Sequence, residues 1–386
     1  MNVPPSAPQN TARHSERKPA LPALTGIRSL AAVCIMLFHF TPAGLQWAAH
    51  PWVTLYPVVD IGFVFVGLFF LLSGFILTYN YADKPGMNAV DFWVARFSRL
   101  YPIYLLTLVI SFPMVVVEFH VRSHAQFIEG MTLTPLLLQG LDPRLAIFVN
   151  TVAWALSCEL VFYLLFPWLN RLRWPRSAGK LLMLFVVLWL FGLTLSALYI
   201  HFDPDHLGHL PDRYSGGFWI TTLKYTPLPY VSTFLAGITL GRLHHIANLG
   251  LRWSTIIGLC GFGSFILLVW GYSAELPYIL LHGGLLLPLF AAMTLGMAGP
   301  GVLARVFSLP PLMWVGGASY ALYLMHFNIF ILLHLHHVPE KLGVAWFDPW
   351  ISYVFIILLA LSVTRWVEVP AQKVIQSWWK KRLATQ

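Results

Sequence analysis

Charged residues are scarce in this chain of 386 residues. Asp, Glu, Lys and Arg make up only 10% of it, whereas hydrophobic residues make up 58%. An ordinary soluble domain carries roughly a quarter of its residues as charges, so this chain cannot cover a water-facing surface. A soluble globular fold is therefore excluded, and lipid must surround most of the protein. Patterns of short alternating strands are also absent, which disfavours a membrane barrel.

Cysteine is equally sparse. Cys34, Cys158 and Cys260 are the only three, and they lie in apolar segments without paired spacing. This excludes a disulfide framework and a structural zinc site, and we expect no metal. Residues 1–20 are polar and proline-rich, without the apolar stretch of a secretory signal. We expect them to form a disordered cytoplasmic tail.

Long apolar runs recur from one end of the chain to the other. Each is about twenty residues long, which is enough to cross roughly 30 Å of hydrocarbon as a helix. The runs predict an all-α fold, a polytopic membrane bundle of about ten transmembrane helices. The predicted helices cover residues 24–47, 58–81, 98–119, 151–169, 179–201, 223–243, 253–272, 277–298, 313–337 and 347–367.

The basic residues are unevenly divided between the two sides of this bundle. If the N-terminus is cytoplasmic, 19 of the 24 Lys and Arg residues lie inside, and the five outside are Arg122, Arg144, Arg213, Lys224 and Lys341. This bias predicts that both termini are cytoplasmic, in a multi-pass protein of the bacterial inner membrane. The net charge of +9 is then explained by the basic residues on the cytoplasmic side, which contact anionic membrane lipid. We expect no nucleic-acid partner.

One domain accounts for most of the chain. We expect residues 21–375 to form a single transmembrane domain, followed by a basic cytoplasmic tail over 376–386. The longest outer loops are predicted at about 120–150 and 202–222, and both are rich in His, Asp, Gly and Pro.

Polar residues inside the membrane are functional candidates because burying them is costly. His39 follows Arg28 by eleven residues, close to three helical turns, so both project from one face about 16 Å apart. One helix would thus carry a cation at the inner rim and a titratable imidazole deeper in the membrane. The alternative is that Arg28 extends to the headgroups and His39 bonds a neighbouring carbonyl.

Glu159 is the only acid clearly inside a predicted span. An unpaired carboxylate there must be neutralised or find a partner on another helix. His39 lies at a similar predicted depth, so Glu159 could orient its imidazole as a general base. The alternative is a protonated Glu159 that serves packing.

Arg96 and Arg99 lie at the predicted cytoplasmic start of the third helix, three residues apart and on one face. Two guanidinium groups there could bind phosphates, or they could simply be flanking charges. Ser73 and Gly74 interrupt the second helix in its inner half, where they could contact substrate or permit close helix packing.

A polar group is also predicted in the ninth helix. Tyr323 and His326 share a face at mid-membrane, and Ser319 lies one turn earlier. These side chains could line a cavity that binds substrate, or Tyr323 and His326 could satisfy each other.

Together these residues resemble the acyltransferase-3 family of bacterial membrane acyltransferases, over about residues 21–375. Arg28 and His39 match the family's motif of a basic residue and a histidine separated by ten residues. Residues 73–75 (SGF) match its second-helix signature. The family's RRxxR element is matched in part, because Ala95 precedes Arg96 and Arg99. The stretches 154–167, 319–326 and 367–370 are similar to three further family patterns, with Ala155 at a position where serine is usual.

The resemblance implies O-acylation of cell-surface carbohydrates. The donor would be cytoplasmic acyl-CoA, usually acetyl-CoA, with Arg28, Arg96, Arg99 and Ser73 as donor contacts. His39 and Glu159 would be catalytic, with His39 as a general base or a transient acyl carrier. The acceptor would be a carbohydrate or glycoconjugate, which would bind near Tyr323, His326 and Ser319. Many relatives carry a fused SGNH hydrolase-like domain, and we expect this chain to act without one.

A second class of function fits the same features. A transporter or flippase for a sugar-linked substrate would also need many helices and buried charges. It would move its substrate without consuming CoA, and often contains paired broken helices, which the sequence does not indicate. Measuring CoA release separates the two classes.

Overall fold

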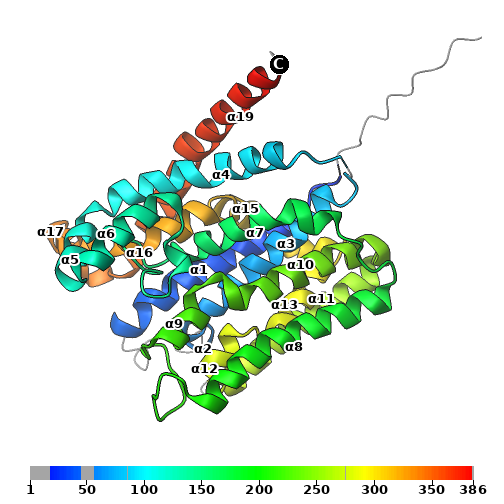
Figure 1. Ribbon diagram of the computed structural model, residues 1–386, viewed down its shortest axis with the longest axis horizontal. Coiled ribbons are helices and arrows are strands. Elements are labelled where there is room, and N and C mark those ends of the chain that lie inside the picture. Colours follow the sequence, from blue (N-terminus) through cyan, green and yellow to red (C-terminus); the bar gives the residue numbers. More distant parts are fainter. Residues whose placement is uncertain (1–17, 45–55, 85, 274, 385–386) are drawn as a thin grey trace, which may run out of the picture.

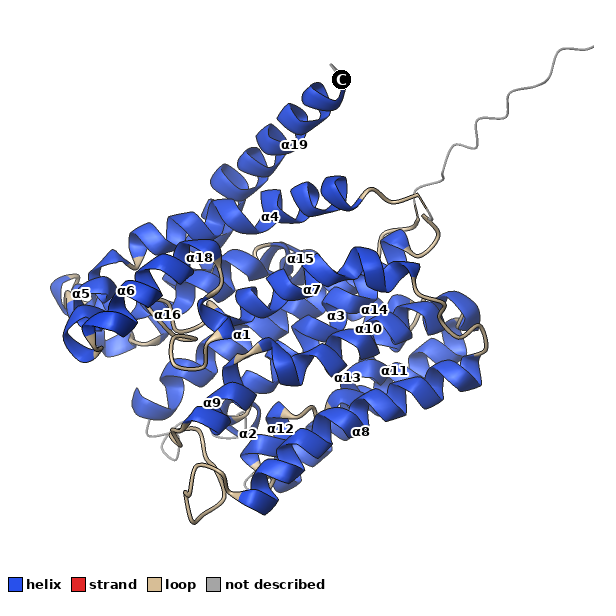
Figure 2. Cartoon of the chain, viewed as in Figure 1, coloured by secondary structure: helices blue, strands red, loops and turns tan. Residues whose placement is uncertain are grey.

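The computed structural model describes residues 18–44, 56–84, 86–273 and 275–384. Within these residues there is no β-strand and helices account for most of the chain (Figure 2). The predicted all-α class is therefore confirmed. The predicted tail up to residue 17, residues 45–47 of the first predicted helix and the last two residues lie outside the described residues.

Nineteen α-helices are described, with longer connections between α6 and α7 and between α8 and α9. In chain order they are α1 (Pro22–Gly44), α2 (Tyr56–Asp60), α3 (Phe65–Tyr81), α4 (Ala89–Ile110), α5 (Phe112–Val121), α6 (His124–Leu133), α7 (Trp154–Arg171), α8 (Ala178–Phe202), α9 (Phe218–Tyr225), α10 (Pro227–Ala247), α11 (Leu251–Tyr272), α12 (Tyr278–His282), α13 (Leu287–Ala298), α14 (Val302–Phe307), α15 (Pro310–Gly317), α16 (Ser319–Leu335), α17 (Val338–Lys341), α18 (Trp350–Val363) and α19 (Val369–Ala384). Short 3₁₀ helices cover Gly62–Val64, Thr134–Leu136, Gln139–Leu141 and Ala345–Phe347, and a π-helical turn at Thr364–Glu368 joins α18 to α19.

Seven helices in the described residues are long and apolar enough to cross a membrane, and the bent pair α15–α16 makes an eighth. α7, with 18 residues, and α10, with 21, are of similar length but more polar, and they pack inside the bundle. Each predicted span overlaps one of these helices. The number of crossings and the cytoplasmic position of the termini stay predictions.

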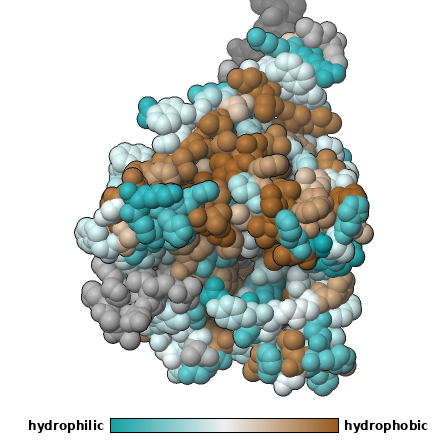
Figure 3. All heavy atoms as spheres, turned by 90° about the vertical axis from the view of Figure 1, so that its left-hand side faces the viewer, coloured by the Kyte–Doolittle hydropathy of each residue, from teal (hydrophilic) through white to brown (hydrophobic). Residues whose placement is uncertain are grey.

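The long helices lie side by side in one bundle (Figure 1), with some of them buried at its centre and others exposing apolar side chains at its rim. α10 packs against both α3 and α8, α11 packs against α13, and α1 contacts α14, α15 and α16. α1 and α3 are largely buried, whereas α8, α11 and α18 expose many apolar side chains. The face in Figure 3 shows a broad apolar area with hydrophilic residues below it. An apolar surface of this kind is suited to lipid rather than to water.

Two predicted spans are broken where the sequence weakens the helix. The span predicted over 98–119 begins earlier, at Ala89, and is interrupted at Ser111, because Pro113 lacks an N–H and disfavours a continuous helix. The span predicted over 313–337 bends by 64° between α15 and α16, directly after Gly316 and Gly317, which are poor helix formers. The bend places Ser319 at the first residue of α16.

Residues 376–384 of the predicted tail continue α19 as a helix.

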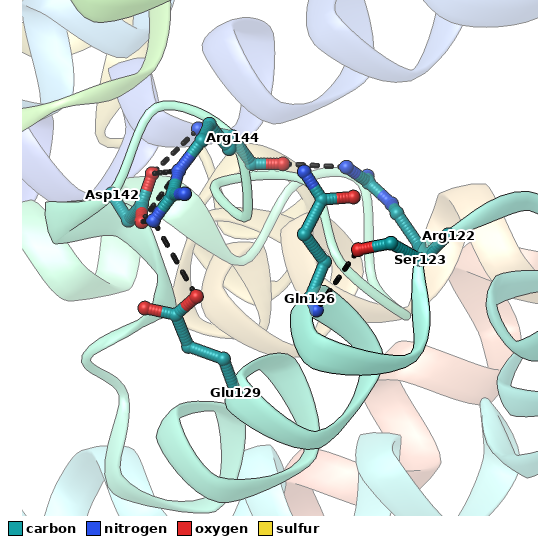
Figure 4. A network of polar contacts seen from close by, with 6 residues as sticks. All are labelled: Arg122, Ser123, Gln126, Glu129, Asp142 and Arg144. Atoms are coloured by element: carbon teal, nitrogen blue, oxygen red, sulfur yellow. Dashed lines mark hydrogen bonds and ion pairs between the residues drawn. The ribbon is translucent and has the colours of Figure 1, made fainter.

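The segment predicted as an outer loop at 120–150 is largely folded. It contains α6, two 3₁₀ turns and a polar network around Arg144 (Figure 4). Arg144 binds the Asp142 carboxylate through its Nε and Nη2, and its Nη2 also lies 3.4 Å from Glu129. Arg122 donates to the Arg144 carbonyl at 2.6 Å. The hydrogen bonds from Arg144 lower the pKa of the Asp142 carboxyl, so this network is ionised at neutral pH.

Gly74 allows α3 and α10 to cross at very short range. A Cβ on Gly74 would lie 2.2 Å from the carbonyl oxygen of Phe234 in α10, and one on Gly237 would meet the carbonyl oxygen of Leu71 at 2.2 Å. Neither helix backbone can accept an extra methyl group without separating. The structure therefore shows a packing role for Gly74.

We expect Gly74→Ala to destabilise the protein, because the added Cβ has only backbone to push against. Overpacking of this kind costs about 1–3 kcal/mol. Gly67→Ala, on the same helix, is the matched control, since outside the local helix backbone no atom of the described residues lies within 4 Å of a Cβ there. Thermal unfolding in detergent measures both variants. Equal melting temperatures for the two would contradict the packing argument.

Candidate active site

A cavity with several polar side chains in its lining lies between α1, α3, α4, α7 and α16. Its polar lining comes from all five helices: Arg28, Ser73, Arg96, Arg99, Glu159, Tyr163, Ser319, Tyr320 and Tyr323. All of the site residues predicted from the sequence line this cavity, apart from His39 and His326. Its lining contains three guanidinium groups and one carboxylate, so the cavity favours an anionic ligand.

Arg96 and Arg99 enter the cavity from the middle of α4. The side chain of Asn88 caps this helix by accepting a hydrogen bond from the Val90 N–H at 2.8 Å. Because α4 begins at Ala89, the two arginines lie inside the helix, and their predicted position at its start is wrong. Their predicted shared face is confirmed, since both line the cavity. The Nε of Arg96 is buried without a hydrogen-bond partner in the described part of the chain.

Glu159 is held by neighbours within the cavity. The Tyr163 hydroxyl donates to its Oε1, and the Ser73 hydroxyl lies 3.5 Å from the same oxygen. Arg28 interacts electrostatically with Glu159 and with Arg99. Tyr163 was not singled out in the sequence, although it follows Glu159 by four residues and must lie one turn away.

The predicted pair between Glu159 and His39 is wrong. The hydrogen-bond partners of Glu159 are Tyr163 and Ser73, whereas the rings around His39 are those of Phe38, Phe40, His326 and Phe327. Residue counts along two helices give depth but not the rotation and tilt of one helix against the other. Glu159 consequently interacts with Arg28, three turns away from His39 on α1.

His326 is the polar neighbour of His39. The centroids of the two imidazole rings are 5.2 Å apart. Nδ1 of His326 lies 2.7 Å from the Tyr323 carbonyl and 3.2 Å from the Leu322 carbonyl, and a carbonyl can only accept. Nδ1 therefore carries a hydrogen, and Nε2 of the neutral ring is a bare acceptor. That Nε2 is buried and has no partner among the described residues.

Tyr323 connects the histidine pair to the cavity. It lines the cavity, and its ring centroid lies 6.0 Å from that of His326. The Tyr323 hydroxyl donates to the Val152 carbonyl at 3.0 Å, so the Tyr323 and His326 side chains do not satisfy each other. Arg28 thus lines the cavity, whereas His39 lies outside its lining, next to His326. The chemistry assigned to these residues stays a prediction.

Arg213 approaches the same region from the segment between α8 and α9. Its Nη2 donates to the Phe38 carbonyl at 3.1 Å, and its guanidinium carbon lies 4.0 Å from the centre of the Phe38 ring. The sequence indicated only that Arg213 was an outer loop residue, because no local pattern relates it to α1.

For metals, no group of three or more His, Cys, Asp or Glu side chains in the described residues is placed to hold an ion.

The sequence matches the model of the family described as "Acyltransferase domain" over residues 21–367. Among curated proteins it is similar to Acyltransferase MdmB of Streptomyces mycarofaciens, with 34% identity over 39% of this chain and 40% of that protein. It is 26% identical to Peptidoglycan O-acetyltransferase OatA of Listeria monocytogenes, over 84% of this chain and 51% of the relative. It is also 25% identical to O-acetyltransferase OatA of Staphylococcus aureus, over 92% of this chain and 57% of the relative.

The chain therefore spans about half the length of the curated relatives it matches. No solved structure matches it.

Proposed function

The chain belongs to the acyltransferase-3 family, and on that premise we propose that it is a membrane O-acyltransferase. It moves an acetyl group from cytoplasmic acyl-CoA to a hydroxyl of an extracytoplasmic carbohydrate or glycoconjugate. The observation that carries this proposal is the cationic cavity, which is lined by Arg28, Arg96 and Arg99 and also by Tyr323, whose ring lies next to that of His326. The OatA relatives are named as O-acetyltransferases, which supports the reaction type.

The donor would enter from the side of the three arginines. Arg28, Arg96 and Arg99 line the cavity, and guanidinium groups bind phosphates well because each presents several N–H donors in a plane. Two polar atoms of the lining, Nε of Arg96 and Oγ of Ser319, are buried without partners in the described chain. Buried polar groups normally have partners, so these two are expected to bond the donor.

The reaction needs a base for the acceptor hydroxyl. In our proposal one nitrogen of His39 takes the hydroxyl proton while the oxygen attacks the thioester carbonyl. The carbon–sulfur bond then breaks, and the departing thiolate recovers the proton from His39, giving an O-acyl ester and CoA. A histidine suits both steps because it can exchange a proton near neutral pH.

His326 takes the orienting role that the sequence suggested for Glu159. Its Nε2 is buried without a partner in the described residues, and the centre of its ring lies 5.2 Å from that of His39. A small rotation of His39 would let one ring N–H donate to this nitrogen, which leaves the other nitrogen of His39 free for the acceptor. The same bond would strengthen when His39 becomes charged during the reaction. Glu159 would instead balance the arginines of the cavity.

The direct test measures CoA release from acetyl-CoA by the purified protein, with and without cell-envelope glycans. Acceptor-dependent release, with ester formation detected by mass spectrometry, supports the proposal. Movement of a glycan across vesicles without CoA release would assign the chain to transport instead.

Arg96→Gln should raise the KM for acetyl-CoA by about tenfold or more, because a charge-assisted hydrogen bond to phosphate is lost. The variant should use an acetyl-pantetheine donor, which lacks the phosphates, as well as the wild type does. Steady-state kinetics with both donors measures this difference. A similar loss with both donors would show that Arg96 does not act on phosphate.

A further inference from the structure

The segment between α8 and α9 is a fixed structure that carries a cation to the outer end of α1. At its start, the Asp205 carboxylate accepts hydrogen bonds from the Ile220 N–H at 2.7 Å and from the Tyr199 hydroxyl at 3.0 Å. Asp212 accepts from the Ser215 N–H at 2.7 Å and from the Ser215 hydroxyl at 2.8 Å. These bonds determine the path of the backbone on both sides of the segment.

Lys224 fastens the tip of this segment from inside the protein. Its side chain is buried, and its Nζ donates to the Arg213 and Ser215 carbonyls at 3.1 Å each. A buried ammonium normally has a carboxylate partner. Lys224 forms no ion pair within the described residues, and two backbone carbonyls hold it instead.

The Arg213 side chain is only partly satisfied. Nη2 bonds the Phe38 carbonyl and the guanidinium stacks on the Phe38 ring, but Nη1 is buried without a partner in the described chain. Since Phe38 precedes His39, this unused donor lies close to the predicted base, and Arg213 interacts electrostatically with the His39 ring. Arg213 is well placed to contact whatever approaches His39 from the outer side.

Arg213 forms no ion pair within the described residues. The one acid that interacts with the neighbouring Lys224 is Asp212, whose Oδ1 accepts the bonds of the Ser215 turn. Its bond to the Ser215 hydroxyl lowers the pKa of the Asp212 carboxyl, so Asp212 is charged at neutral pH and offsets only one cation. Arg144, by contrast, is neutralised by Asp142 and Glu129.

We propose that the acceptor carries an anionic oxygen, from a carboxylate or a phosphate, which binds Arg213 while the neighbouring hydroxyl reaches His39. This inference rests on the proposed acyl transfer and adds the chemical class of the acceptor. An anionic oxygen supplies the missing partner of Nη1 and balances the second cation. Because the site is partly desolvated, such a bond is stronger than it would be in water. Arg213 is thus a specificity-determining residue.

The test compares acceptors that share a glucose-type ring but differ in charge. Methyl glucuronide and glucose 1-phosphate represent the carboxylate and phosphate sources, methyl glucoside is the neutral counterpart, and total cell-envelope glycan is the reference acceptor. We expect kcat/KM to be about tenfold to a hundredfold higher for one or both anionic acceptors, as for a charge-assisted hydrogen bond. Which of them is preferred identifies the source of the charge.

The preference should disappear in Arg213→Gln and persist in part in Arg213→Lys, which keeps the charge. The KM for acetyl-CoA should not change in either variant, which shows that the donor side is intact. Arg144→Gln is the matched control, because Arg144 is another outer arginine, half exposed and already paired with carboxylates. It should retain the wild-type preference.

The outcomes separate the two proposals. Equal use of charged and neutral acceptors by the wild type, or an unchanged preference in Arg213→Gln, would overturn the anionic-acceptor inference alone. Absence of CoA release with every acceptor, including the envelope glycan, would overturn the proposed function itself.

Discussion

His39→Ala should abolish measurable acyl transfer while leaving the protein folded. General-base catalysis contributes about 10²–10⁴-fold to a rate, and in our proposal no other side chain can replace His39. The His39 ring contacts His326 and Phe327, so its removal leaves a small cavity without disturbing the arginines that we propose to bind the donor. The measurement is acceptor-dependent CoA release, together with direct binding of acetyl-CoA, which should be retained.

Three further variants test the same proposal. His326→Gln keeps an acceptor near the position of Nε2 and should lose less activity than His326→Phe, mainly in kcat. His334→Gln is the matched control from the same helix, because the His334 ring bonds the Phe330 carbonyl and, at 2.6 Å, the Asp348 carboxylate. It should transfer normally. Wild-type turnover in His39→Ala would remove the proposed base.

The membrane bundle could be predicted because its signal is local. Apolar runs of helical length and the scarcity of charge do not depend on how the helices pack, and every predicted span overlaps a helix. The breaks at Ser111 and between Gly317 and Ser319 were missed. Their local signals, Pro113 and the two glycines, are also tolerated inside membrane helices, so sequence alone could not decide between a bend and a straight span.

The residues of the site were easier to predict than their partners. Helical periodicity places Arg28 and His39 on one face and likewise Arg96 and Arg99, because it is a property of a single helix. The pairing of Glu159 depends on how α7 rotates against α1 and α3, which no local pattern encodes. Arg213 was missed as a site residue for a similar reason, since its place beside Phe38 results from the fold of a long connection.

The charge balance of the cavity predicts that Arg28 and Glu159 depend on each other. Arg28→Gln should lower kcat/KM for acetyl-CoA by about a hundredfold. The change removes a guanidinium group that we propose to bind the donor phosphates. It also leaves the Glu159 carboxylate less compensated by positive charge in the same cavity. Glu159→Gln keeps an oxygen that can accept from Tyr163 and Ser73, so its effect should be smaller. The double variant should recover part of the activity lost in Arg28→Gln.

A double-mutant cycle with the two single variants and the combined variant measures this coupling. Arg305→Gln is the control, because Arg305 lies on the same predicted side of the membrane but is exposed and outside the cavity lining. Its kinetics should match the wild type. If the two losses simply add, Glu159 does not act through the charge of Arg28. A role for the Glu159 carboxylate in the transfer step would then be favoured. If Glu159 only balanced the charge of Arg28, its loss would have little further effect once Arg28 is replaced.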